Sequence, residues 1–161
     1  MATIAREPGS DRIQQLSVLA ENRTVELGAI TRALAEYHVR ILAISILAAA
    51  EHAVVRLVVN RSAQAILALE GQGYRVLRSD LLGVALPLAE EPEIGIRKVV
   101  TALVAAEVRI EYVYSLITPV DGHPVLALHV DDPAVAARAL RTVGLSLVDQ
   151  AQLDWGETPD A

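Results

Sequence analysis

The chain repeats itself, and this internal repeat is the feature that most constrains its fold. The segment Ala43–Ile46 aligns with Tyr112–Ser115, which lies 69 positions later, and the residues before it align at the same offset. Farther along the offset becomes 71, so that Val59-Asn60 aligns with Val130-Asp131. The two extra residues fall in the turn-rich stretch Thr118–Gly122, where a surface loop tolerates insertions. A gap that coincides with a loop is what duplication of one folding unit produces.

The first half carries a strand, a helix, two strands, a helix and a strand, in that order. Alternation of apolar and other residues, together with β-branched content, predicts strands over 13–20, 39–47, 54–59 and 74–79. Apolar residues at helical spacing predict a helix over 25–37, with Thr24 as its N-cap. A second helix is expected to run from the capping residue Ser62 to Leu69, and Gly71 and Gly73 end it.

The second half repeats this order, with strands over 81–86, 108–117, 125–130 and 145–148. Helices are expected over 94–106 and 133–143, the latter starting with Pro133 at an early helical position. Twice βαββαβ is the split-βαβ, ferredoxin-like motif. We therefore predict an α+β fold of two ferredoxin-like βαββαβ modules, each an antiparallel sheet with helices on one face. Module 1 is residues 12–79 and module 2 is residues 80–149, with a short linker around Ser79-Asp80.

The uncovered face of each sheet needs a partner. In the strand 39–47 both alternating sets of residues are apolar: Val39, Ile41, Ala43 and Leu47 on one side, and Leu42, Ile44 and Ile46 on the other. Burial on both faces, or extension of the sheet by a partner, would explain this pattern. Either the two modules cover one another or a homodimer covers them. The polar tail, residues 150–161 with Trp155, either docks or is disordered.

Composition excludes several classes of function. The formal net charge is −6, which argues against nucleic acid as a partner, because phosphates need clustered Lys and Arg. Cysteine is absent, which excludes disulfides, thiolate metal sites and thiol nucleophiles. The histidines lack the spacing of metal ligands, and no serine–histidine arrangement suggests a nucleophile. We expect no metal, no cofactor and no catalytic residues.

Nothing in the chain predicts contact with a membrane. Residues 1–10 hold no apolar segment typical of a signal peptide. The longest apolar run, Ile41–Ala50, is shorter than the about 20 residues that a membrane-spanning helix needs. A cytoplasmic protein is the expectation.

The ordered pattern resembles the ACT domain family, and most closely the stand-alone tandem ACT proteins of bacteria. The resemblance covers residues 13–148. The segments that carry it are Gln15-Leu16-Ser17-Val18-Leu19 with Glu21-Asn22, then 30–36, 41–46, 55–59 and 110–114. It implies a ferredoxin-like module that binds an amino acid and regulates a metabolic enzyme. The Pro-Gly pair of the family's first strand–helix loop is Thr24-Val25 here and Glu93-Ile94 in module 2, where Gly95 comes one place late.

The strand–helix loops are the candidate ligand site. A helix N-terminus offers unpaired N–H groups and a positive dipole end, which suit a ligand carboxylate. Asn22 could fix the ammonium or the carboxylate of the ligand, and Glu21 could fix the ammonium. Together with the resemblance, this predicts ligand-binding residues in both loops and on the strand 108–117 of module 2. They are Glu21, Asn22, Thr24, Val25 and Leu27, then Glu91, Glu93, Ile94 and Gly95, and finally Tyr112 and Tyr114.

Each candidate also has a structural interpretation. Asn22 and Thr24 could merely form a turn and a cap, and the acidic residues of the second loop could be solvated and favour the helix dipole. Tyr112 and Tyr114 point to the same face of a strand. They could line a pocket between the modules or simply pack.

Three functional hypotheses remain. The first is a regulatory protein that senses an amino acid at the interface of the modules or of a dimer. The second is a structural module that pairs through its sheets and has lost the ligand site. The third, an enzyme, is the weakest, because no constellation of acid, base and nucleophile stands out.

Overall fold

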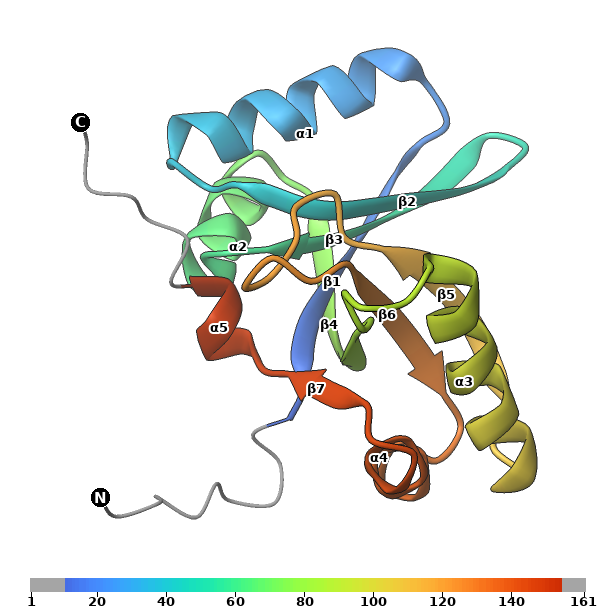
Figure 1. Ribbon diagram of the computed structural model, residues 1–161. Coiled ribbons are helices and arrows are strands. Elements are labelled where there is room, and N and C mark those ends of the chain that lie inside the picture. The colour runs from blue at the N-terminus through green and yellow to red at the C-terminus, as the bar shows by residue number, and fades with distance from the viewer. Residues whose placement is uncertain (1–10, 155–161) are drawn as a thin grey trace, which may run out of the picture.

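The computed structural model describes residues 11–154, and its elements follow the predicted order twice (Figure 1). Module 1 contains β1 (Ile13–Glu21), α1 (Thr24–Glu36), β2 (Ile41–Ala49), β3 (His52–Val59), α2 (Ser62–Gly71) and the first part of β4 (Arg75–Ala85). Module 2 contains the rest of β4, then α3 (Pro92–Ala105), β5 (Ile110–Ser115), β6 (Val125–Val130), α4 (Pro133–Thr142) and β7 (Ser146–Val148). The short helix α5 (Gln150–Asp154) follows. The prediction of two βαββαβ modules is confirmed.

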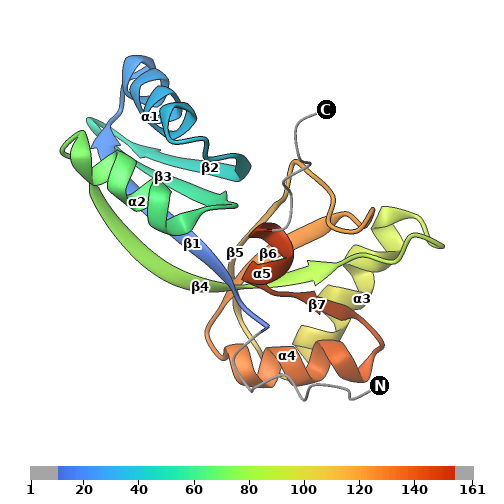
Figure 2. The same cartoon turned by 90° about the vertical axis from the view of Figure 1, so that its left-hand side faces the viewer.

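One strand belongs to both modules. The predicted strands 74–79 and 81–86 form a single strand, β4. The prediction of a linker around Ser79-Asp80 is therefore wrong. Both residues stay extended because they pair with β1: Asp80 lies opposite Gln14, and Ser79 lies opposite Gln15. The end of β4 then pairs with β6 and β7 of module 2. Figure 2 shows β4 bending from one module into the other.

The duplication is visible in individual hydrogen bonds. The side chain of Asn60 accepts the backbone N–H of Arg40 at 2.8 Å, and Asp131 accepts that of Arg109 at 2.9 Å. These are equivalent residues of the two modules. Equivalent positions His38 and Glu107 also share a left-handed backbone, with φ of 54° and 56°. The alignment of the two halves of the chain therefore agrees with the structure.

Two predicted helix caps are wrong by one residue. Thr24 and Ser62 are the first residues of α1 and α2, and the preceding Arg23 and Arg61 occupy the N-cap positions without a capping side chain. The early proline of α4 is confirmed, and Asp132 caps that helix by accepting the N–H of Val135 at 3.1 Å.

The molecule has four layers, helices, sheet, sheet and helices, and three apolar clusters fill the spaces between them. One lies between the module 1 sheet and its helices, and one lies between the module 2 sheet and its helices. The third joins the two sheets through the faces that carry no helix, and it includes Ile13, Val58, Val125, Ala127 and Leu153. The helices lie on the outer sides in Figure 2. The modules thus cover one another, which is one of the two predicted arrangements.

A β-bulge explains the doubly apolar strand. The pairing of β2 with β3 shifts between Ile41 and Ala43, so Leu42 is the extra residue. Both Leu42 and Ala43 enter the cluster between the sheets, while Ile44 packs on the helix side. A bulge at the equivalent position, between Ile110 and Tyr112, interrupts β5. Of the tail, α5 docks through Leu153, whereas Trp155 lies outside the described residues.

Candidate functional site

The first strand–helix loop is fastened to the turn between β2 and β3. The backbone N–H of Asn22 donates to the carbonyl of Glu51 at 2.8 Å, and its side-chain amide donates to the carbonyl of Ala50 at 2.9 Å. Arg23 lies 2.9 Å from Glu21 and 3.2 Å from Glu26. The side chain of Asn22 therefore holds the loop in place, and Arg23 bridges the two carboxylates beside it.

A groove of about 710 Å³ opens beside this loop at the outer end of module 1. Its walls are mostly apolar, and its polar groups are two carboxylates, an imidazole and a phenol. The lining residues are Leu19, Ala20, Glu21, Glu26, Leu47, Ala49, His52, Ala53, Val54 and Tyr74. An apolar cleft with a few converging polar groups is the usual form of a small-molecule site.

Glu26 and Tyr74 form the ordered polar pair of this groove. The hydroxyl of Tyr74, which lies just before β4, donates to Oε2 of Glu26 on α1 at 2.7 Å. Burial raises the pKa of Tyr74 to about 12, and the hydrogen bond to Glu26 and its negative charge add to the effect. Tyr74 thus stays a neutral donor at physiological pH and orients the carboxylate of Glu26.

Sequence reasoning found one lining residue of this groove and missed the others. Glu21 was predicted, whereas Asn22, Thr24, Val25 and Leu27 lie in or just after the loop and do not line the groove. A usable signal existed for Tyr74, because β4 runs antiparallel to β1 and begins with Arg75 opposite Leu19, which brings the preceding Tyr74 to the end of β1. Glu26 lies in the first turn of α1, where a carboxylate is favoured by the helix dipole.

The second strand–helix loop lies at the opposite end of the molecule (Figure 2). Glu91 precedes α3 as its N-cap residue, Glu93 lies in the first turn, and Ile94 is exposed. Gly95 is buried, and a Cβ atom there would come within 3.3 Å of the side chains of Leu86 and Pro87. Gly95 therefore permits close packing of α3 on its own strand–loop segment.

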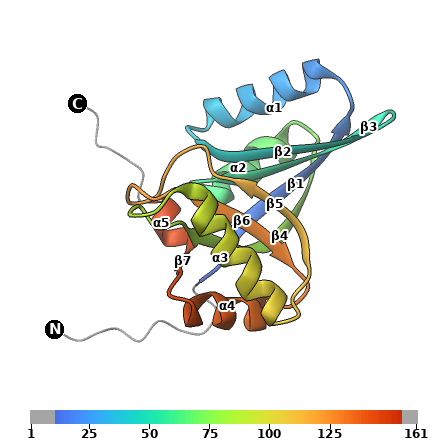
Figure 3. The same ribbon diagram turned by 45° about the vertical axis from the view of Figure 1, so that its right-hand side comes forward.

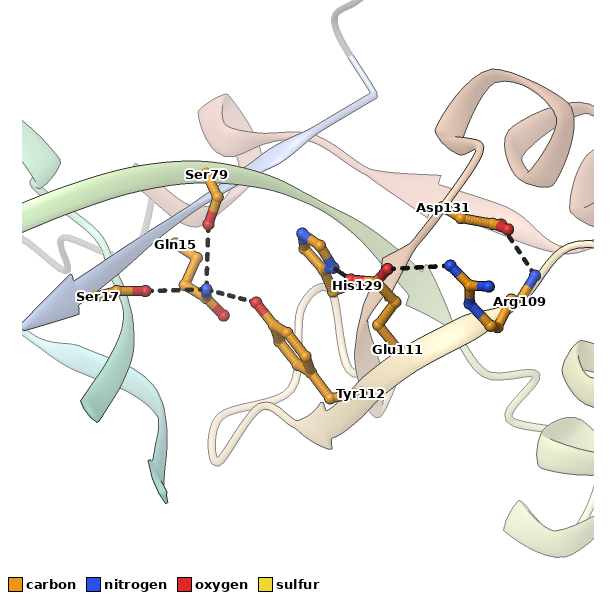
Figure 4. A network of polar contacts seen from close by, with 8 residues as sticks. All are labelled: Gln15, Ser17, Ser79, Arg109, Glu111, Tyr112, His129 and Asp131. Carbon is orange, nitrogen blue, oxygen red and sulfur yellow. Dashed lines mark hydrogen bonds and ion pairs between the residues drawn. The ribbon is translucent and has the colours of Figure 1, made fainter. Parts of the chain in front are cut away.

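The two predicted tyrosines lie between the modules and pack against a buried glutamine of β1. Gln15 is 1% exposed. Its Nε2 lies 2.8 Å from the Tyr112 hydroxyl, 3.1 Å from Ser79 Oγ and 3.3 Å from Ser17 Oγ (Figure 4). The hydroxyl of Tyr114 donates to Gln15 Oε1 at 2.6 Å. We call these five residues the Gln15 cluster.

Arg56, His129 and Glu111 lie around the Gln15 cluster. The guanidinium of Arg56 lies 3.9 Å from the centroid of the Tyr112 ring, and His129 stacks on that ring at 4.7 Å. His129 Nδ1 is 2.9 Å from Glu111 Oε2, within ion-pair distance but without hydrogen-bond alignment. Burial raises the pKa of Tyr114, the nearby Tyr112 raises it further, and Arg56 lowers it. The cluster is a packed polar contact between sheets.

The predicted residues thus occupy three separate places. The first loop borders the groove, the second loop lies at the far end of module 2, and the tyrosines lie in the packed interface between the modules. Residues 11–154 contain no group of three or more His, Asp or Glu side chains arranged to hold a metal ion. Within the same range, none of the helices is long and apolar enough to span a bilayer.

Comparison with known proteins agrees with this architecture. A family model described as "ACT domain pair" matches residues 11–155. No curated protein matches the chain significantly. Among solved structures, protein BT0572 from Bacteroides thetaiotaomicron superimposes with a TM-score of 0.79 at 24% identity, covering 89% of this chain and 96% of that one. The ligand-free regulatory subunit of aspartate kinase from Thermus thermophilus gives 0.58 at 16% identity, covering 82% and 93%.

Proposed function

Since the chain belongs to the ACT domain pair family, we propose that it is a regulatory protein that binds an amino acid or a similar small molecule and modulates a metabolic enzyme. The groove of module 1 is the proposed binding site. The protein is further proposed to be cytoplasmic, to lack catalytic activity of its own and to form a homodimer. Regulatory subunits among its structural neighbours support this assignment of role.

The groove is the observation that carries the proposal, because it combines carboxylates that suit a ligand ammonium with apolar walls that suit a side chain. Glu26, oriented by Tyr74, lies where it could accept hydrogen bonds from a ligand ammonium. Leu19, Leu47 and Val54 offer apolar surface to an aliphatic side chain. The first N–H groups of α1, at Thr24 and Val25, lie outside the groove lining, just after the loop beside it, and they are the proposed partners of the ligand carboxylate. Leu27, one turn into α1, remains a predicted binding residue.

Arg23 favours the alternative, a structural module without a ligand. Its guanidinium already contacts both Glu21 and Glu26, so the carboxylates are not free for a ligand ammonium until that contact opens. Both ion pairs are well exposed on the arginine side, and such surface pairs are worth at most about 1 kcal/mol. A ligand ammonium could therefore replace Arg23 at small cost.

Isothermal titration of the chain with each of the twenty amino acids tests the proposal. We expect one of them to bind. Glu26→Gln should weaken the affinity for that amino acid by about tenfold or more, since a charged hydrogen bond is worth about 1.5–3 kcal/mol. Glu36→Gln, at the exposed end of the same helix, is the matched control and should bind normally. Absence of binding for all twenty at millimolar concentration would favour the structural alternative.

The stoichiometry of the same titration tests the second loop. One ligand per chain is expected if only the groove of module 1 binds. Two would assign a second site to Glu91, Glu93, Ile94 and Gly95, which remain predicted residues of module 2. Tyr112 and Tyr114 are proposed to act indirectly, by coupling the modules through Gln15.

A further inference from the structure

A second cavity, of about 560 Å³, lies at the inner end of module 1, at the other end of β1 from the groove. It opens between the start of α2, the paired strands β1 and β4, and the helix α5. Figure 3 shows α5 beside α2. Gln150 of α5 donates to the carbonyl of Val59, just before α2, at 3.0 Å. Among the polar residues that line the cavity are Arg12, Gln14, Asn60, Arg61, Ser62 and Gln150.

The backbone donors at the start of α2 have no acceptor among the described residues. The first hydrogen bond of this helix joins the N–H of Ala65 to the carbonyl of Arg61 at 2.9 Å. The N–H groups of Ser62, Ala63 and Gln64 precede that bond, and no side chain caps them. All three residues line the cavity. Their N–H groups and the positive end of the helix dipole suit an anion.

Two side chains add buried donors to the same cavity. Asn60 is 2% exposed, and its Oδ1 accepts the N–H of Arg40 at 2.8 Å. This fixes the orientation of the amide, and its Nδ2 makes no hydrogen bond with the described residues. The hydroxyl oxygen of Ser62 is completely buried and is likewise without a hydrogen bond in this part of the chain. Because a buried polar group costs free energy unless it is paired, these donors point to an acceptor from outside the chain.

The equivalent helix of module 2 supplies its own anion. Asp131-Asp132 aligns with Asn60-Arg61, and the carboxylate of Asp132 accepts the N–H of Val135 at 3.1 Å. Pro133, in the place of Ser62, has no N–H to satisfy. Module 1 therefore has donors where module 2 has carboxylates, and an anion bound to module 1 would take the place of the carboxylate that caps α4.

We propose that this cavity binds the phosphate group of a small phosphate ester. A phosphate ester offers three terminal oxygens to the converging donors, whereas a carboxylate offers two. The guanidinium of Arg12 would balance its charge, since Arg12 lines the cavity and makes no ion pair with the described residues. Arg61 adds a second guanidinium to the lining.

Two carboxylates restrict the rest of the ligand. Asp80 of β4 and Asp154 of α5 also line the cavity, and both residues are exposed. They would repel a second anionic group and would accept hydrogen bonds from hydroxyl groups. A compound with one phosphate and several hydroxyl groups, such as a sugar phosphate, therefore fits better than a polyanion. It would contact both module 1 and α5, independently of the amino acid proposed for the groove.

Titration of the full chain, followed by the amide NMR signals and without any amino acid, tests the site. Ribose 5-phosphate is the probe, ribose is its phosphate-free control, and inorganic phosphate separates a free phosphate from an ester. We expect both phosphates to shift the amide signals of Ser62, Ala63 and Gln64, the ester to bind more tightly, and ribose not to bind. No binding of either phosphate at millimolar concentration, or shifts confined to other helices, would overturn the proposal. Equal affinity for inorganic phosphate would contradict the assignment to an ester.

Asn60→Asp is the sharpest variant, because Asp131 shows that a carboxylate can accept the same backbone N–H. It replaces the free amide donor by a negative charge and should weaken phosphate binding by at least about tenfold. Asp131→Asn is the matched control in module 2 and should bind normally. Unchanged affinity in Asn60→Asp would contradict the proposed site.

A second pair of variants covers the case in which Asn60→Asp fails to fold. Arg12→Gln removes the charge that faces the cavity and should weaken phosphate binding by about tenfold. Arg32→Gln, at an exposed position of α1 outside the cavity lining, should have no effect. Equal affinities in Arg12→Gln and Arg32→Gln would show that the phosphate binds elsewhere.

Discussion

The hydroxyl of Tyr114 in module 2 donates a 2.6 Å hydrogen bond to Oε1 of Gln15 in module 1. The two residues are 99 positions apart in the chain, and the glutamine is almost completely buried. A buried amide is tolerated only when its hydrogen bonds are made. The packing of the two sheets therefore depends on this contact between polar groups as well as on the apolar cluster around it.

Replacing Gln15 by Leu should destabilise the protein by about 1–3 kcal/mol, because the hydroxyls of Tyr112 and Tyr114 lose a buried partner. Urea denaturation measures the change. Tyr114→Phe in the same background should cost less than it does alone, which a double-mutant cycle detects. Gln72→Leu, at the exposed C-cap of α2, is the control and should have little effect. Equal costs for Gln15 and Gln72 would contradict the structural role of the Gln15 cluster.

The side chain of Gln150 should protect the start of β1. Its Oε1 accepts the N–H of Gln14 at 2.8 Å, and its Nε2 donates to the carbonyl of Val59 at 3.0 Å. In Gln150→Ala the amide of Gln14 loses its acceptor and should exchange with solvent faster. Hydrogen exchange followed by NMR measures this at single residues. An unchanged rate at Gln14 would show that α5 does not hold this strand in solution.

Two glycines in equivalent helices should respond differently to alanine. Gly28 of α1 has open space around an added Cβ, so Gly28→Ala should stabilise the protein by about 1 kcal/mol through helix propensity. Gly95→Ala should gain less or lose stability, because Leu86 and Pro87 lie 3.3 Å from the new atom. Thermal unfolding of both variants gives the comparison. A larger gain for Gly95→Ala would show that this contact is not restrictive.

Tyr74 should make stability depend on alkaline pH. Its pKa rises from 10.0 to about 12 on folding, so the folded state holds the proton more tightly than the unfolded state. The resulting stability is present below pH 10 and is lost as the pH rises from about 10 to about 12. Denaturation at several pH values should show a smaller loss in Tyr74→Phe than in the wild type. Tyr114 contributes in the same direction to both proteins, so the difference between them isolates Tyr74.

The groove shows where sequence reasoning reached its limit. Loop chemistry identified Glu21, but Glu26 and Tyr74 are 48 positions apart and meet only because β4 returns beside β1. The interface between the modules was expected, and so was the pairing of Tyr112 and Tyr114 on one face. Their contact with Gln15 could not be predicted, because Gln14, Gln15 and Ser17 are all polar residues of β1 and only the packing of module 2 buries Gln15 among hydroxyl groups.

The sequence by itself determined the order of helices and strands, their approximate bounds and the duplication, because periodicities of 3.6 and 2 and the capping residues act within a few positions. The tertiary structure decided that β4 is shared, which sheet faces meet and which polar groups converge. These features depend on strand register and on packing between residues far apart in the chain.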